Sequence, residues 1–276
     1  MTRLFFYALA VMLLVITLHA CDLNILEAED PYPEGKANVR VVHIAPEAGT
    51  IKYFHGDQIP SFNEVISHDP ADTTDEGEQR IYNNVDALAF QHISDYVQVP
   101  VGRTPDGFLN EDGDTLIVRD VMDGRLAKRF FDYERNFTVF ALHGGTGNVH
   151  IRSMEIEPTP NAKGQVRMRV LHAVSGAPAV DIYLTEPGES ISDENLFLFD
   201  IGFNNEGGDA GTAPSEMPLY FPSEPGTYDV KVTVSQSSDV IFSQEVVLEA
   251  SRNYTMVIFP TETNDGIDRL MLLPDN

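Results

Sequence analysis

The chain has 276 residues, of which 18 are lysine or arginine and 43 are aspartate or glutamate, so its formal net charge at pH 7 is −25. This charge repels nucleic-acid phosphates and anionic lipid head groups, which argues against nucleic-acid binding and against electrostatic docking on a bilayer. The length accommodates two hydrophobic cores of ordinary size. Since the chain has one cysteine, no disulfide within it can hold either core.

The N-terminal segment has the pattern of an export signal. Arg3 precedes a mostly apolar run of about 15 residues that ends at Leu18, and this run is too short for a membrane-spanning helix. It is followed directly by His19, Ala20 and Cys21, the only cysteine of the chain.

Leu18-His19-Ala20-Cys21 resembles the lipobox of bacterial lipoproteins, in which a branched residue, a tolerant position and a small residue precede the lipidated cysteine. The resemblance implies that residues 1–20 are a lipoprotein signal peptide. It also implies that Cys21 carries the lipid that anchors the protein to a membrane of the bacterial cell envelope, with the folded part periplasmic or extracellular. The alternative is an ordinary secretory signal with Cys21 as a free thiol. The choice between inner and outer membrane stays open.

Residues 21–37 are rich in acidic residues and proline and show no periodicity, so we expect a flexible, lipid-anchored tether there.

An internal repeat follows the tether. Three motifs recur, at offsets of 129, 113 and 117: Arg40-Val41-Val42-His43 as Arg169-Val170-Leu171-His172, Leu88-Ala89-Phe90 as Ile201-Gly202-Phe203, and Arg135-Asn136-Phe137-Thr138 as Arg252-Asn253-Tyr254-Thr255. The offset of 117 also aligns Arg152 and Met154 with Arg269 and Met271. Because the offsets change only across loop-like stretches, we expect two copies of one unit, over residues 38–157 and 158–276.

Both copies have the period of β-strands. Apolar and polar residues alternate over several short runs, Gly, Pro, Asn and Asp clusters separate these runs, and no stretch shows a sustained helical period. Short strands with such turn signals are typical of sandwiches. The sequence therefore predicts an all-β fold, with two tandem immunoglobulin-like β-sandwich domains.

Two segments carry a resemblance to a known family. Residues 169–183 follow the pattern R-V-x-H-A-x-x-x-A-P-x-V-D-I-Y, and residues 96–102 follow the pattern Y-x-x-V-P-x-G. Both resemble the family of domains of unknown function numbered 4397 (DUF4397). The first copy departs at Glu47–Thr50, where it lacks the proline, and the second departs at Ser223–Pro225. The resemblance covers nearly all of residues 38–276 and implies tandem β-sandwiches in an exported or cell-surface protein, with no known activity.

The paired histidines His43 and His172 fall on the strand face that carries Val41 and Val170. We therefore expect both rings to be buried and neutral, with their nitrogens hydrogen-bonded to a neighbouring turn. Metal ligation would need further ligands from other strands. The glycine-rich segment 144–147 between His143 and His150 is expected to be a plain hairpin turn.

Asn110, Asp112 and Asp114 alternate as calcium ligands can, and they are the candidate metal ligands of the chain. The segment lacks the glycine and the terminal glutamate of an EF-hand loop. Asp and Asn are also common in β-turns that bind no metal. Both interpretations stay open.

The sequence gives little support for catalysis, because it has no nucleophile elbow, zinc-protease helix or phosphate-binding loop. A pair of catalytic carboxylates among the many acidic residues stays open. We expect a non-enzymatic binding, adhesion or envelope-scaffolding protein without a cofactor, which acts on a protein or glycan in the envelope through the loops that carry the long acidic inserts 56–86 and 185–217. The alternatives are a glycan-binding or hydrolytic accessory lipoprotein with its site near residues 156–165, and a calcium-stabilised surface protein.

Overall fold

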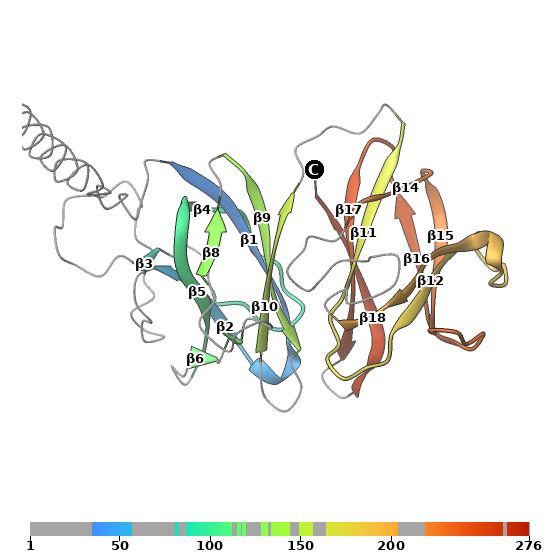
Figure 1. The fold of residues 1–276 in the computed structure, drawn as a ribbon, viewed down its shortest axis with the longest axis horizontal. Helices are drawn as coiled ribbons and strands as arrows, with labels where there is room; N and C mark the ends of the chain where they lie inside the picture. Colours follow the sequence, from blue (N-terminus) through green and yellow to red (C-terminus); the bar gives the residue numbers. More distant parts are fainter. Residues whose placement is uncertain are drawn as a thin grey trace, which may run out of the picture.

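The computed structural model describes residues 35–56, 81–82, 87–111, 115–116, 118–119, 128–131, 134–143, 149–156, 164–203, 219–261 and 264–275. Over these residues the chain forms β-strands and two short 3-10 turns, η2 (Pro46–Ala48) and η3 (Asp193–Asn195), and it has no α-helix. The strands form four sheets that are stacked as two sandwiches (Figure 1). The prediction of an all-β sandwich fold is confirmed, and the immunoglobulin-like topology stays a prediction.

The first sandwich encloses a core that includes Val39, Val41, Val139 and Phe108. Its inner sheet, which faces the second sandwich, has the order β4 (Val97–Pro100), β1 (Lys36–Ile44), β9 (Asn136–His143), β10 (Val149–Ile156) and β7 (Val118–Arg119). The opposite sheet has the order β3 (Ile81–Tyr82), β2 (Ile51–Gly56), β5 (Gly102–Asn110) and β6 (Thr115–Leu116), and β8 (Lys128–Phe131) also pairs with β5.

The second sandwich repeats this plan around a core that includes Met168, Ile182 and Val232. Its inner sheet has the order β14 (Phe221–Ser223), β11 (Val166–His172), β17 (Asn253–Thr261) and β18 (Asn264–Pro274). The opposite sheet, called the outer sheet below, has the order β13 (Leu196–Ile201), β12 (Val180–Thr185), β15 (Gly226–Val234) and β16 (Val240–Leu248). The strands β11 and β17 are parallel, as are β1 and β9.

The strand pairing agrees with most of the sequence matches and corrects one. Leu88 bridges to Ile51 and Ile201 pairs with Val180, so these residues occupy the same place in the two copies. The offset of 117 that aligned Arg152 and Met154 with Arg269 and Met271 is wrong. Glu155 pairs with Phe137 whereas Pro274 pairs with Tyr254, so the last strand of the second copy is offset by 119, because the β17–β18 hairpin is longer and contains a register shift. The boundary between residues 157 and 158 lies outside the described residues and stays a prediction.

The two sandwiches pack sheet against sheet. A buried apolar cluster joins five residues of the first sandwich to five of the second: Val42, Ile44, Phe140, Leu142 and Met154, and Leu171, Ala173, Val257, Phe259 and Leu273. Figure 1 shows β9 and β10 beside β11, β17 and β18 at this junction. The strands β1, β9, β11 and β17 are therefore largely buried on both faces.

Two equivalent arginines reach across the junction. Nε of Arg40 donates to Oγ1 of Thr138 at 2.9 Å, and Nε of Arg169 donates to Oγ1 of Thr255 at 2.8 Å. Nη1 of Arg40 donates to the carbonyl oxygen of Pro274 at 2.9 Å, and Nη1 of Arg169 donates to that of Glu155 at 2.8 Å. Because Glu155 and Pro274 hold the same place in their sandwiches, each copy binds the last strand of the other in the same way.

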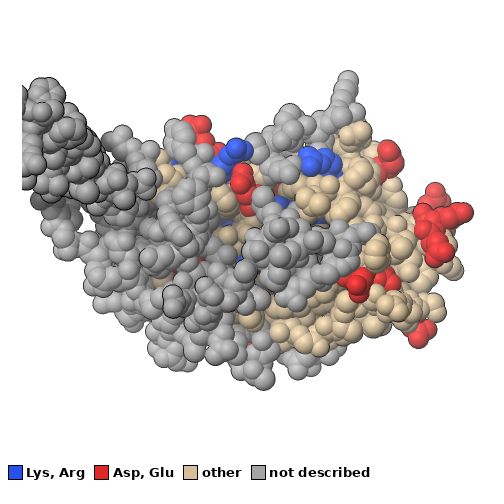
Figure 2. All heavy atoms as spheres, viewed as in Figure 1, with Lys and Arg blue, Asp and Glu red and all other residues tan. Residues whose placement is uncertain are grey.

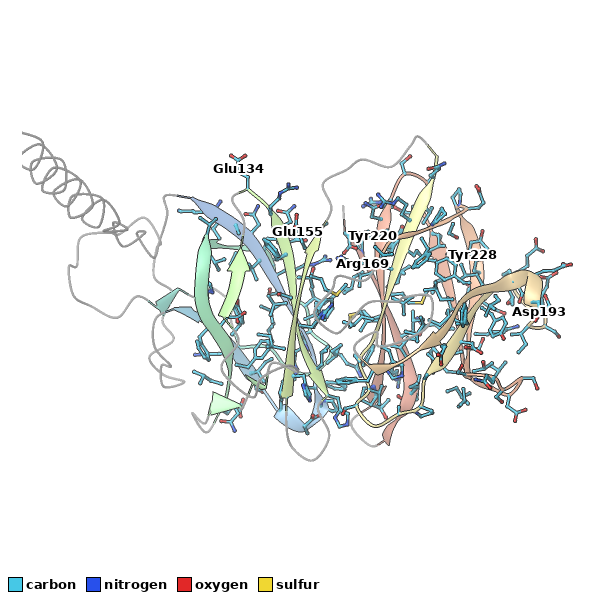
Figure 3. The ribbon with its side chains drawn as sticks, in the orientation of Figure 1. Glu134, Glu155, Arg169, Asp193, Tyr220 and Tyr228 are labelled. Carbon is cyan, nitrogen blue, oxygen red and sulfur yellow. The ribbon has the colours of Figure 1, made fainter. Side chains whose placement is uncertain are left out.

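Asp275 lies between the two arginines, and its side chain is fully buried. Its Oδ1 is 3.0 Å from Nη2 of Arg40, and its Oδ2 is 3.6 Å from Nη2 of Arg169. Oδ2 also accepts hydrogen bonds from the hydroxyls of Thr255 at 2.6 Å and Tyr220 at 2.7 Å. Figure 3 shows Arg169 and Tyr220 close together at the junction.

A tyrosine ring packs against each guanidinium group. The ring of Tyr96 lies 5.4 Å from Arg40, and the ring of Tyr220 lies 4.6 Å from Arg169. Such cation–π contacts stabilise a desolvated guanidinium. Tyr96 precedes β4 and Tyr220 precedes β14, so this contact is also repeated in the two copies.

We predict that Asp275→Ala lowers the free energy of unfolding by about 3–5 kcal/mol, because removing one partner leaves buried guanidinium charge uncompensated. The measurement is urea denaturation followed by circular dichroism. Glu249→Ala is the matched control, since Glu249 and Arg252 form a 2.9 Å ion pair whose side chains are 62% and 43% exposed. The control is expected to cost less than about 1 kcal/mol, and equal losses in the two variants would contradict the role assigned to Asp275.

Candidate functional site

The two histidines of the repeat close equivalent turns. Nδ1 of His43 accepts a hydrogen bond from the amide of Ala45 at 3.3 Å, and its Nε2 is 2.6 Å from the carbonyl oxygen of Gly49. His172 makes the same two contacts, with the amide of Val174 and the carbonyl of Pro178, both at 3.3 Å. An accepting Nδ1 and a donating Nε2 require a neutral ring with its proton on Nε2. The predicted structural role of both histidines is confirmed.

Burial favours the neutral form of both rings. It lowers the pKa of His43 below 6.5 and lowers the pKa of His172 to about 4. Hydrogen bonds to the carbonyls of Gly49 and Pro178 act in the opposite direction, but desolvation is the larger effect. Both histidines therefore remain uncharged at neutral pH, and their hydrogen bonds stabilise the two turns.

A buried polar cluster is confined to the first sandwich. Tyr53 and His55 on β2 and Asp106 on β5 are all 0% exposed. The hydroxyl of Tyr53 donates to Oδ2 of Asp106 at 3.1 Å, and His55 lies directly opposite Asp106 in the antiparallel pair.

The second sandwich has aliphatic residues at these places: Ile182 for Tyr53, Leu184 for His55, and Val230, which pairs with Leu184, for Asp106. The sandwich therefore folds without the polar cluster, whose burial carries a desolvation cost. Such a departure from the requirements of folding is typical of functional sites. His55 and Asp106 are residue types that ligate metals, but no group of three or more His, Cys, Asp or Glu among the described residues is placed to hold a metal ion.

The described half of the second acidic insert forms a folded loop over the outer sheet. Its 3-10 turn η3 is capped by Ser192, whose amide donates to Oδ1 of Asn195 at 2.8 Å. The amide of Gly188 donates to Oδ2 of Asp229 at 2.9 Å, and the ammonium of Lys231 donates to the carbonyl of Glu189. These contacts fix the loop to β15.

This loop, residues 186–195, is called the acidic tip below. It borders an open hollow with a volume of about 360 Å³, lined by Glu189, Ser190, Ser192, Glu194 and Asn195. Figure 2 shows acidic side chains gathered at the end of the second sandwich that points away from the first, and Figure 3 labels Asp193 there. The tip therefore presents a concentrated negative charge at the far end of the molecule.

The solvent-facing side of the outer sheet also exposes apolar side chains. Leu196 and Phe199 on β13 are 37% and 46% exposed, and Ile241 and Val247 on β16 are 43% and 58% exposed. All four belong to strands at the edges of this sheet. Exposed apolar residues that are rimmed by polar ones are typical of protein-contact surfaces.

The structure places few of the predicted site residues. Cys21, Asp112, Asp114 and almost all of insert 56–86 lie outside the described residues. Asn110, the remaining candidate metal ligand, ends β5 and pairs with Ile51. The described residues include no helix that is long and apolar enough to cross a membrane.

The histidines beside the predicted glycine turn each contact another side chain. Nδ1 of His143 is 2.7 Å from Oε2 of Glu47. The ring of His150 packs edge-on against Phe203, with 5.4 Å between ring centroids. The turn itself, residues 144–147, lies outside the described residues.

Tyr53, His55 and Asp106 were not among the predicted site residues. The signal was available, since the offset of 129 that aligns the motifs places Tyr53 and His55 on Ile182 and Leu184. Where one copy has a polar residue and the other an aliphatic residue, the shared fold does not require either type at that position.

No family model and no curated protein matches the chain. Among solved structures, the Bacillus anthracis TIE protein is 6% identical with a TM-score of 0.21, over 82% of this chain and 34% of that one. A leucine-rich repeat protein from Bacteroides thetaiotaomicron VPI-5482 is 11% identical with a TM-score of 0.18, over 85% of this chain and 26% of that one. A candidate cell adhesion protein from Parabacteroides distasonis ATCC 8503 is 11% identical with a TM-score of 0.17, over 87% of this chain and 97% of that one. The chain thus spans about a third or less of the first two proteins, and these TM-scores are too low to establish a shared fold or function.

We predict that the free energy of unfolding falls as the pH is lowered from 6.5 towards 4. In this pH range His172 is protonated in the unfolded chain, whereas in the folded protein its pKa of about 4 keeps it neutral. His172→Gln removes this contribution. Between pH 7 and pH 4, the free energy of unfolding should therefore fall in the His172→Gln variant by about 2–3 kcal/mol less than it falls in the wild type. Identical pH profiles for His172→Gln and the wild type would contradict the assignment.

We predict that the triple variant Tyr53→Ile, His55→Leu, Asp106→Val unfolds at the same or a higher urea concentration than the wild type, because it installs the aliphatic set of the second sandwich. The single variant Asp106→Val leaves the Tyr53 hydroxyl without this acceptor and should cost about 1–3 kcal/mol. Chemical denaturation of both variants measures the difference. A triple variant as unstable as the single one would show that the first sandwich needs the polar cluster to fold.

Proposed function

We propose that this protein is an exported, lipid-anchored, non-enzymatic binding protein of the bacterial cell envelope, with an adhesion or scaffolding role. In this proposal it consists of two DUF4397-like, immunoglobulin-like sandwiches. The junction between the sandwiches is the observation that carries the proposal. Its apolar cluster and its shared Arg40–Asp275–Arg169 contacts fix the second sandwich relative to the first.

This rigidity gives the molecule two distinct ends. The proposed tether would enter at β1 in the first sandwich, while the acidic tip and the outer sheet belong to the second (Figure 1). A binding surface on the second sandwich is then held at a fixed orientation away from the anchored one. Preorganisation of this kind reduces the entropy that is lost when a partner binds.

The chemistry of the outer sheet and tip favours binding over catalysis. Apolar side chains beside a charged rim are the ordinary composition of a protein-contact surface. His43 and His172, which a hydrolase could use as general bases, are buried with both ring nitrogens engaged in turns. The net charge of −25 supports a partner with a basic surface.

We predict that Cys21→Ser moves the protein from the membrane pellet to the soluble fraction of lysed cells, because the acylated residue is lost and each buried methylene contributes about 0.8 kcal/mol to anchoring. The measurement is immunoblotting after ultracentrifugation. His19→Ala is the control, since it changes the tolerant position of the lipobox and should leave the protein in the pellet. Retention of Cys21→Ser in the pellet would contradict lipid anchoring.

Proximity crosslinking in intact cells tests the binding function. A recurrent envelope partner with a basic surface is expected for the anchored wild type. Screening against glycans and ester substrates provides the opposite test. Turnover that is lost on changing a single carboxylate would overturn the non-enzymatic function.

A further inference from the structure

Among the described residues, strand β16 forms one edge of the outer sheet and pairs there with β15 alone. Its pairing has one register shift, next to Val240, and is regular from Phe242 to Leu248. The side of an edge strand that faces away from its neighbour presents backbone N–H and C=O groups to an incoming strand. Natural proteins usually obstruct such an edge with charges, bulges or short strands.

Other edge strands of this sandwich are obstructed in these ways. The pairing of β13 with β12 contains two register shifts, and Asp200 within β13 adopts a positive φ of 55°. Strand β14 has only three residues, and β18 carries the charged residues Asp268 and Arg269. By contrast, β16 has nine residues and a single charged one, Glu245. It is therefore the regular, weakly protected edge.

The side chains of β16 supply chemical selectivity. Ile241, Ser243, Glu245 and Val247 are exposed and alternate along the strand, so they share its solvent-facing side. Asp239 and Glu249 flank the strand at its two ends and are also exposed. A strand added beside β16 would thus meet apolar residues near both ends and a carboxylate between them.

We propose that β16 accepts an extended segment of a basic partner protein as an additional strand of the outer sheet. This inference rests on the proposed binding function and names the mode of binding and the chemistry of the partner. Backbone hydrogen bonds to the edge would supply affinity, and alternating side chains would supply specificity. Lysine or arginine pairs with Glu245, and apolar residues contact Ile241 and Val247.

Charge selects a basic partner over a second copy of this chain. Each copy carries a formal charge of −25, Glu245 lies on the strand, and Asp239 and Glu249 flank it. Two β16 strands placed side by side would bring these carboxylates together, and like charges on neighbouring strands are destabilising. A basic segment placed beside β16 would instead carry positive charges that attract these carboxylates.

Fluorescence anisotropy tests the proposal with a labelled nine-residue peptide that carries lysine at positions 1 and 7, valine at positions 3 and 9, and serine elsewhere. When this peptide lies parallel to β16, these four side chains share one face and lie beside Asp239, Glu245, Ile241 and Val247 respectively. The double variant Ile241→Lys, Val247→Lys should bind this peptide at least about tenfold more weakly than the wild type, because it repels the peptide and removes apolar contacts. The double variant Ile93→Lys, Leu219→Lys makes the same change of charge at exposed positions outside the outer sheet and should stay within about twofold. A peptide with proline at its centre should bind more weakly than the parent peptide, because proline lacks an amide donor.

Three outcomes overturn the proposal: no binding to the wild type, equal weakening in both double variants, or a wild-type dimer in analytical ultracentrifugation that the β16 variant abolishes. The last outcome would assign the edge to a second copy of the chain. Photo-crosslinking in cells separates this proposal from the proposed function. Crosslinks from position 243 support the strand addition, whereas crosslinks from the acidic tip alone preserve the binding function and refute the use of β16.

Discussion

The carboxylate of Asp275 between Arg40 and Arg169 is the interaction on which the arrangement of the two sandwiches depends. Each guanidinium group spans from its own sandwich to a backbone carbonyl of the other, and the single carboxylate offsets part of their combined positive charge. A buried charge is tolerated only with such partners, since its desolvation is costly. The surrounding apolar cluster supplies most of the contact area, and the ionic group specifies one relative orientation of the two sheets.

The polar residues of the repeated motif act in pairs with distinct structural tasks. The arginine of the motif R-V-x-H crosses the junction, and the histidine three residues later, on the opposite face of the strand, closes a turn. The tyrosine before β4 and the one before β14 cover the arginines. These motif residues therefore serve the shape of the molecule, and chemistry that distinguishes the two copies is found elsewhere, in Tyr53, His55 and Asp106.

The sequence was sufficient for the strand content and for the turn-closing histidines, because period-two patterns and turn residues are local signals. It was not sufficient for the junction. The run from Phe137 to Leu142 is apolar or small at nearly every position, and this continuity indicates burial on both faces. We expected alternation there, and the sequence alone does not identify what covers the second face. The contact of Arg40 with Asp275 joins residues 235 positions apart, so no local pattern predicts it.

The two-sided burial of β1 and β9 also has a consequence during biosynthesis. The first sandwich is made before the second, so Val42, Ile44 and Phe140 stay in contact with water until β11 and β17 have formed. During that interval the unprotected surface matches the second sandwich of any neighbouring chain as well as its own. Exchange of halves between nascent polypeptides is therefore the misassembly to which this architecture is most vulnerable, and it becomes more frequent as expression rises.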